Sequence, residues 1–235
     1  MENLPPKKSH KTRIITNVLT TALKFWLKSQ VSQVSQLDVE IKAGDRQLLS
    51  GRIPWVSINA TNAVYKGIHV TQIQLAAENI QVNIGGILKG QPVKLLHIVP
   101  VVGNLIIEEK DINSSLGSEL LSTALNDVVL KILPESCLKY QLISWEKITI
   151  GDHKILVVGI ISSTSELTPI EISLNLELVN GHELKLENIQ VRQNQVAMLE
   201  NEHSFHIDLG SDIDIQELTL IPGKLVCQGK INVNP

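Results

Sequence analysis

The stretch VSINATNAVYKGIHVTQIQLAAENIQVNI, residues 56–84, decides the fold because its apolar residues recur at every second position. Side chains at alternate positions of a β-strand point to the same face, so the stretch predicts half-buried strand. The alternation slips by one residue after Val70 and again after Ala77. A slip inside a long strand predicts a β-bulge, which bends and twists a sheet.

The same alternation continues outward from this stretch in both directions. The further predicted strands are Leu37–Ala43, Val93–Ile98, Val101–Glu108, Leu142–Ile150, Ile155–Ser162, Ile170–Leu178, Glu183–Val191, Ser204–Leu209, Ile213–Leu220 and Leu225–Val233. Asn180-Gly181 stands between two of them, and this dipeptide is a strong signal for a hairpin. Strand is therefore the main element of the fold.

Two segments have helical spacing instead. In the first, apolar residues recur at three- and four-residue steps: Ile15, Leu19, Leu23, Trp26, Leu27 and Val31. The second is Asp111–Leu133, where four-residue steps join Ile112, Leu116, Leu120, Ala124, Val128 and Ile132. Asp111 and Ser114 offer N-cap oxygens for this helix, and Pro134 ends it.

The order helix, strands, helix, strands predicts an α+β fold with an antiparallel sheet, because the strands do not alternate with helices. We expect both helices to cover one concave face of one sheet, since each has a single apolar stripe. No linker divides the chain, so we expect a basic flexible leader at residues 1–13 and a single domain at residues 14–235.

Charge is unevenly distributed. The net charge of −3 argues against a nucleic-acid partner, whereas residues 1–28 hold six basic residues and one acidic residue. Lys7, Lys8, Lys11 and Arg13 precede the first helix, and they predict contact with an anionic membrane surface. The alternative is a solubilising leader, with the first helix belonging to the core.

The first helix is too short and too polar to span a bilayer, and no small-x-small cleavage site follows it. The two cysteines, Cys137 and Cys227, lie in apolar stretches and predict buried reduced thiols. We therefore expect a peripheral protein at the cytoplasmic face of a membrane, in preference to the periplasm.

Motifs for catalysis and for metal binding are weak. The sequence has no Gly-x-Ser-x-Gly elbow, and Gln91 stands where a phosphate-binding loop needs lysine. His203 and His206 would point to opposite faces of a strand, which does not suit a shared metal. We predict a protein that is not an enzyme and has no metal and no cofactor, apart from bound lipid.

Several blocks resemble the LmeA-like phospholipid-binding family, particularly its cyanobacterial members. They are Trp26-Leu27-Lys28-Ser29-Gln30-Val31, Arg46-Gln47-Leu48-Leu49-Ser50-Gly51-Arg52-Ile53-Pro54, Asn62-Ala63-Val64-Tyr65-Lys66-Gly67-Ile68-His69, Leu88-Lys89-Gly90, Asp111-Ile112-Asn113 and Asp208-Leu209-Gly210-Ser211-Asp212-Ile213-Asp214-Ile215. The blocks extend over about residues 18–233.

That family is similar to the tubular lipid-binding proteins, and the resemblance implies a strongly curved antiparallel sheet that wraps one or two long amphipathic helices. It also implies phospholipid as the partner and a role in lipid transfer or membrane maintenance. The candidate groove residues are Ile112, Leu116, Leu120, Ala124, Val128, Leu19 and Leu23. Periodicity alone does not separate a lipid groove from a dry core, so a membrane-peripheral scaffold without internal lipid is the alternative, and an enzyme acting on lipid is a third.

Overall fold

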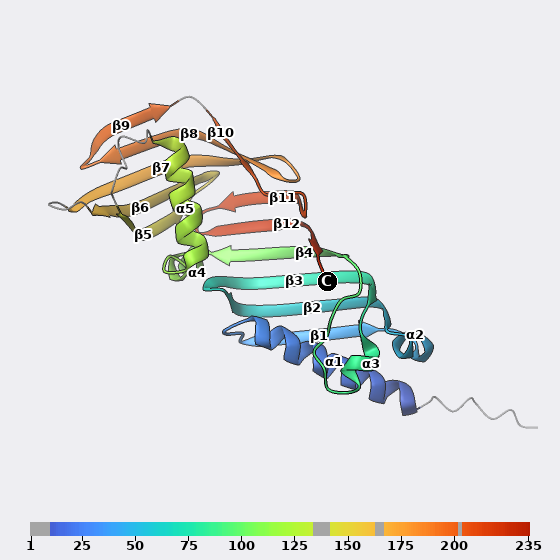
Figure 1. Ribbon diagram of the computed structural model, residues 1–235. Helices are drawn as coiled ribbons and strands as arrows, with labels where there is room; N and C mark the ends of the chain where they lie inside the picture. Colours follow the sequence, from blue (N-terminus) through green and yellow to red (C-terminus); the bar gives the residue numbers. More distant parts are fainter. Residues whose placement is uncertain (1–9, 134–141, 163–166, 202–203) are drawn as a thin grey trace, which may run out of the picture.

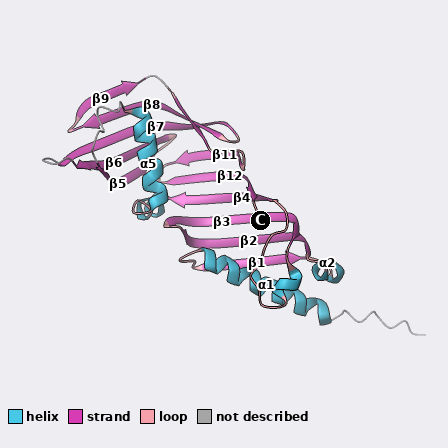
Figure 2. Cartoon of the chain, in the orientation of Figure 1, coloured by secondary structure: helices cyan, strands magenta, loops and turns pink. Residues whose placement is uncertain are grey.

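The computed structural model describes residues 10–133, 142–162, 167–201 and 204–235 (Figure 1). The helices are α1 (His10–Gln30), α2 (Asp45–Leu49), α3 (Ile84–Ile87), α4 (Glu109–Ser114) and α5 (Glu119–Ile132). The strands are β1 (Gln36–Lys42), β2 (Arg52–Tyr65), β3 (Ile68–Gln81), β4 (Val99–Glu108), β5 (Leu142–Ile150), β6 (Lys154–Ser162), β7 (Leu167–Asn180), β8 (Glu183–Gln193), β9 (Val196–Asn201), β10 (Phe205–Asp208), β11 (Ile213–Ile221) and β12 (Lys224–Val233). The fold is α+β with strand predominating, as predicted (Figure 2).

The strands form two antiparallel sheets in place of the one expected. The first sheet has the order β1-β2-β3-β4-β12-β11, and the second has the order β10-β8-β7-β6-β5, with β9 beside β8. The last two strands of the chain thus return to the first sheet and pair beside β4 (Figure 1). The predicted hairpin at Asn180-Gly181 is confirmed, since β7 and β8 pair on either side of it.

The deciding stretch forms the β2–β3 hairpin, but the predicted bulge within it is wrong. The two strands keep one register along their length. The slip after Ala77 occurs at Asn79, where φ is 55°, and the slip after Val70 lies opposite Asn62 of β2, where φ is 47°. Asparagine adopts this left-handed conformation more readily than most residues. The reversal of faces therefore needs no extra residue in the pairing.

The single helix predicted over Asp111–Leu133 is in fact two helices, α4 and α5. The Ser118 side chain caps α5, since its Oγ accepts a hydrogen bond of 3.2 Å from the Leu121 N–H. The β2–β3 hairpin packs at this break: a Cβ on Gly67, where φ is 81°, would lie 2.7 Å from the Ser118 Cβ. The hairpin thus approaches the chain closely at the break between α4 and α5. The four-residue apolar spacing of the sequence does not reveal this approach.

Other local predictions were also wrong. Residues 93–98 form no strand before Val99; a single bridge joins Leu95 to Val82. The short helices α2 and α3 and the strand β9 were not predicted. The two helices are shorter than the windows in which helical periodicity can be recognised, and the Val196–Leu199 part of β9 is an apolar run without alternation.

Two separate clusters of buried apolar residues result. One lies between α1 and the first sheet and contains Leu19, Leu48, Val56, Ala77 and Val99. The other lies between α5 and the second sheet and contains Val129, Ile148, Ile170, Ile189 and Val191. The two helices thus cover different sheets, which corrects the expectation of one shared sheet.

Helix α4 joins the two sheets through polar contacts. The Asn113 side chain donates to the Ile148 carbonyl at 2.7 Å and accepts from the Ile148 N–H at 2.8 Å. On the other side, Thr71 of β3 donates to the Asp111 carboxylate. The block Asp111-Ile112-Asn113 therefore connects β3 of the first sheet with β5 of the second.

Candidate functional site

A groove of about 670 Å³ lies between α1 and the first sheet. Helix α1 lines it with Leu19, Leu23, Trp26 and Leu27. The strands of the sheet line it with Ile41, Ile53, Val56, Ile58, Leu75, Ala76, Ala77, Ile80, Val99, Val101, Ile231 and Val233. The segment after β3 and the chain end add Val82, Ile87, Val93, Lys94, Leu95, Asn234 and Pro235. Volumes of roughly 300–1,000 Å³ are typical of small-molecule sites.

The lining is almost entirely aliphatic. Of its described residues, Lys94 is the only one with a charged side chain, and its ammonium makes no hydrogen bond or ion pair to another described group. The backbone around it is fixed by Asn83, whose Oδ1 accepts from the Lys94 N–H at 2.7 Å and whose N–H donates to the Lys94 carbonyl at 3.2 Å. The groove thus presents one cation beside a large apolar surface.

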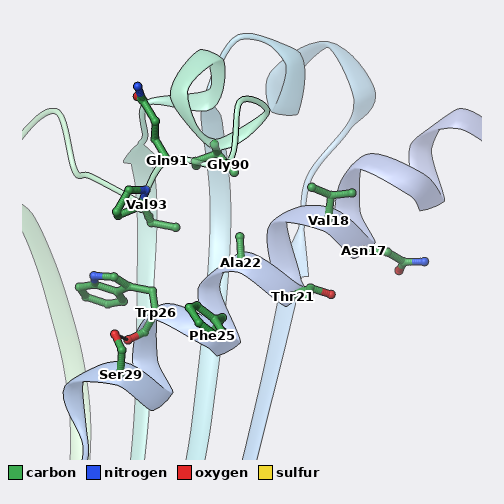
Figure 3. A pocket seen from close by; sticks show the side chains of 12 residues that line it. Asn17, Val18, Thr21, Ala22, Phe25, Trp26, Ser29, Gly90, Gln91 and Val93 are labelled. Atoms are coloured by element: carbon green, nitrogen blue, oxygen red, sulfur yellow. Dashed lines mark hydrogen bonds between the residues drawn. The ribbon is translucent and has the colours of Figure 1, made fainter.

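A second hollow, of about 590 Å³, lies on the other flank of α1 (Figure 3). Trp26, Ile87 and Val93 line both hollows, so these three residues separate them. The outer hollow is more polar, with Asn17, Thr21, Ser29 and Gln91 in its lining. Phe25 at its border is 77% exposed. Exposed side chains of this size often mark a contact surface.

The groove stays open because only part of α1 packs closely against the rest of the protein. The helix packs on the edge strand β1 and on α2, where Leu19 is 3% exposed and Leu48 is fully buried. Farther along the helix, Leu23 is only half-buried, and the sheet opposite contributes the small side chain of Ala77. Short side chains facing a helix leave space that a larger core residue would fill.

The predicted groove residues divide between two places. Leu19 and Leu23 line the groove. The other five lie on or beside α4 and α5: Ile112, Leu116 and Val128 pack against the second core, Leu120 is 47% exposed, and Ala124 is exposed. The assignment of these five to a lipid groove stays a prediction, because three of them pack against the second core, two are exposed, and none lines either hollow.

The predicted membrane-surface residues lie at the start of the chain. Lys7 and Lys8 fall outside the described residues, while Lys11 and Arg13 fall within α1, which begins at His10. The helix thus starts before the expected end of the leader. None of the described helices is both long enough and apolar enough to cross a membrane.

Other candidate chemistry is sparse. His203 lies outside the described residues, and the Nδ1 of His206 lies 2.8 Å from the Glu183 carboxylate on the neighbouring strand. Within the described parts of the chain, no three histidine, cysteine, aspartate or glutamate side chains gather as metal ligands would. Cys227 is a half-buried free thiol whose pKa is raised by burial, and Cys137 lies outside the described residues.

Sequence reasoning missed the segment that closes one end of the groove, residues 82–95. Val82, Ile87, Val93 and Leu95 of this segment line the cavity, yet the sequence suggested a loop followed by a strand. Val82 and Val93–Ile98 alternate as strand residues do, and the apolar residues between them stand isolated among glycines, with no helical or strand period. The structure supplies what periodicity could not, namely that these residues fold back toward α1.

Comparison with known proteins agrees with this geometry. A comparison with curated proteins and one with solved structures gave no match. The model of one protein family, described as LmeA-like phospholipid-binding, matches residues 11–230. That range contains α1 apart from its first residue, and both sheets as far as Lys230 of β12. Because the match covers nearly the whole chain, the chain belongs to the LmeA-like phospholipid-binding family.

Proposed function

We propose that the protein holds phospholipid with its acyl chains in the groove beneath α1. The observation that carries this proposal is the groove itself, an aliphatic space of about 670 Å³ in a chain that belongs to a phospholipid-binding family. Acyl chains gain free energy when they leave water for such a surface, at about 25 cal/mol per Å² of apolar area. Leu19, Leu23 and Ala77 form the part of the lining in which the tails lie.

The head group is assigned to the end of the groove beside Lys94. This ammonium is the one charged side chain in the described lining, and it has no protein partner there. A phosphate beside Lys94 would form a charge-assisted hydrogen bond with its ammonium, because the aliphatic lining offers no partner of opposite charge. The lipid therefore lies with its tails under α1 and its phosphate at the segment that follows α3.

The membrane partner is an anionic surface, met reversibly by the basic start of the chain. Lys7, Lys8, Lys11 and Arg13 each contribute about 1 kcal/mol at most near such a surface. The binding is therefore expected to weaken as salt is raised. A position at the cytoplasmic face, and roles in lipid transfer or membrane maintenance, belong to the same proposal; protease protection in sealed membrane vesicles tests the side.

Mass spectrometry of an organic extract of the purified protein tests lipid binding directly. We expect phospholipid in near-stoichiometric amount from the native chain and little from Ala77→Phe, which places a ring in the groove. Val102→Phe is the matched control, because Val102 is 47% exposed, does not line the groove and points to the opposite face of β4 from the groove residue Val101. This control should keep its lipid.

A lipid-free extract from the native chain would contradict the proposal. The protein would then be a membrane-peripheral scaffold, in which α1 and its exposed Phe25 serve as a surface contact alone. Loss of lipid from Val102→Phe equal to that from Ala77→Phe would show a general effect of added bulk and would also remove support for this groove.

A further inference from the structure

The apolar face that floors the groove continues beyond it across the first sheet. Strand pairing places Leu75 beside Gly103, and Gly103 beside Gly229. The next row toward α4 places Ile73 beside Leu105, and Leu105 beside Cys227. Because alternate residues share a face, these two rows lie on the same face as Ala77 and Val101 of the groove.

No helix or loop in the described chain buries this surface. Ile73, Leu75, Leu105 and Cys227 are half-buried, and none of them belongs to either buried cluster or packs against one. In Figure 1 the middle of β3, β4 and β12 lies open between α1 and α5. The surface therefore lies between the two cores without being part of either.

The opposite face of the same strands has a different character. Its middle row is polar, with Gln74, Asn104 and Gln228, while the two flanking rows mix Gln72 and Lys230 with Ala76, Val102, Ile106 and Val226. A sheet normally packs its more apolar face against something. Here that face is continuous with a cavity, because Leu75 and Ile231 already line the groove.

Two glycines shape the middle of this surface. Gly103 and Gly229 are direct partners on β4 and β12, so two neighbouring positions carry no side chain. The missing side chains lower the floor between Leu75 on one side and Ile215 on the other. A Cβ on Gly229 would lie 2.7 Å from the Asp214 carbonyl oxygen, whereas one on Gly103 would lie 2.8 Å from the flexible Leu75 side chain and 3.4 Å from the Gln74 carbonyl oxygen.

We propose that these two rows, Leu75-Gly103-Gly229 and Ile73-Leu105-Cys227, form a binding track for the distal carbons of long acyl chains of the bound lipid. The inference rests on the proposed function, because the chains must first lie under α1 for their ends to reach the track. The occupant is a hydrocarbon chain because the track is apolar, uncharged and continuous with the groove. A lipid with short chains fills the groove and leaves the track empty.

Cys227 provides a native probe of the track. The protein is incubated with vesicles of dioleoylphosphatidylglycerol or with dioctanoylphosphatidylglycerol, separated from free lipid by gel filtration, and treated with a maleimide. With the long-chain lipid at about ten times its dissociation constant during loading, we expect Cys227 to react about tenfold more slowly than in the lipid-free protein. Peptide mapping distinguishes Cys227 from Cys137.

The short-chain lipid should leave the rate of Cys227 alkylation unchanged although it is bound. Equal protection by both lipids, or none by the long-chain lipid while its extract contains phospholipid, would overturn the track and leave the proposed function intact. An extract without lipid would overturn the proposed function first, so the two failures are distinguishable.

A pair of variants gives an independent test. Gly103→Phe fills the track, and Asn104→Phe adds the same ring on the polar face of the same strand. We expect Gly103→Phe to retain bound lipid but to favour the dioctanoyl lipid in competition, whereas Asn104→Phe keeps the native preference. Circular dichroism confirms folding of each variant, and a native chain-length preference in folded Gly103→Phe would contradict the proposal.

Discussion

The two helix-covered regions of the molecule use similar aliphatic residues but reach different degrees of packing. In the second region, Ile148, Ile170, Ile189 and Val191 are at most 2% exposed. In the first region, Leu48 is the only large side chain of the described core that is so completely buried. The same kinds of side chain therefore form a filled core under α5 and a groove under α1.

The difference has a local cause. Helix α5 is fixed on its sheet by apolar packing and by the Trp145 indole, which donates to the Asn126 side chain at 3.0 Å. Helix α1 lies on an edge strand, and the sheet opposite its second half includes the small side chains of Ala76 and Ala77 in the groove lining. A region that must bind a ligand gives up packing that a structural region keeps.

The largest expected effect comes from the filled core. Ile189→Ala removes a side chain that is 0% exposed, and we expect it to lower the free energy of unfolding by about 2–5 kcal/mol. Urea denaturation followed by circular dichroism measures this change. A loss below about 1 kcal/mol would mean that the second region is packed no better than the first, against the comparison.

The connection between the two regions should matter nearly as much. Asn113→Ala removes two hydrogen bonds to Ile148. The N–H and the carbonyl of the buried Ile148 then lose these partners. We expect a loss of about 2 kcal/mol and a separation of the thermal transitions of the two regions. Asn104→Ala, on the exposed face of β4, serves as the control. One unchanged transition in Asn113→Ala would show that α4 does not couple the sheets.

Sequence and structure agree on most strands because alternation is a strong local signal, as in Glu183–Val191 and Leu225–Val233. They disagree where contacts between distant residues decide the outcome. The break in the second helix lies where Gly67 approaches Ser118, and one end of the groove is lined by residues 82–95, which fold back toward α1. The four-residue spacing through Leu120 and Ala124 is equally compatible with a lipid-facing or a core-facing helix, so periodicity did not distinguish the two regions.

Truncation in the groove should have a smaller effect on stability than truncation in the core. Leu23 is half-buried beside an empty volume, so Leu23→Ala in the lipid-free protein should cost less than about 1 kcal/mol. Lipid should stabilise the native chain against heat more than it stabilises this variant. Phe25→Ala on the same helix is the control, and equal stabilisation of all three proteins would remove Leu23 from the site.

The smallest effect concerns an exposed ion pair beside α4, the helix that connects the two sheets. The hydrogen bond and charge of Lys110 lower the pKa of Glu108 below its ordinary value of 4.5. A carboxyl group whose pKa is lower in the folded than in the unfolded protein stabilises the fold at pH values above the unfolded pKa. This contribution is lost as the pH falls through the folded pKa. We expect a slight acid-dependent loss that disappears in Lys110→Ala, measured as the melting temperature between neutral and acidic pH. A large acid effect that survives this substitution would have another origin.

Hydrogen exchange with and without phosphatidylglycerol tests the central claim most directly, because it compares both regions in one experiment. The groove account predicts that bound lipid slows exchange in α1, in β2 and β3, and in residues 82–99, while α5 and its sheet stay unchanged. Protection confined to α5, where Ile112, Leu116 and Val128 meet the second core, would contradict the account and return the lipid to the helix that the sequence first indicated.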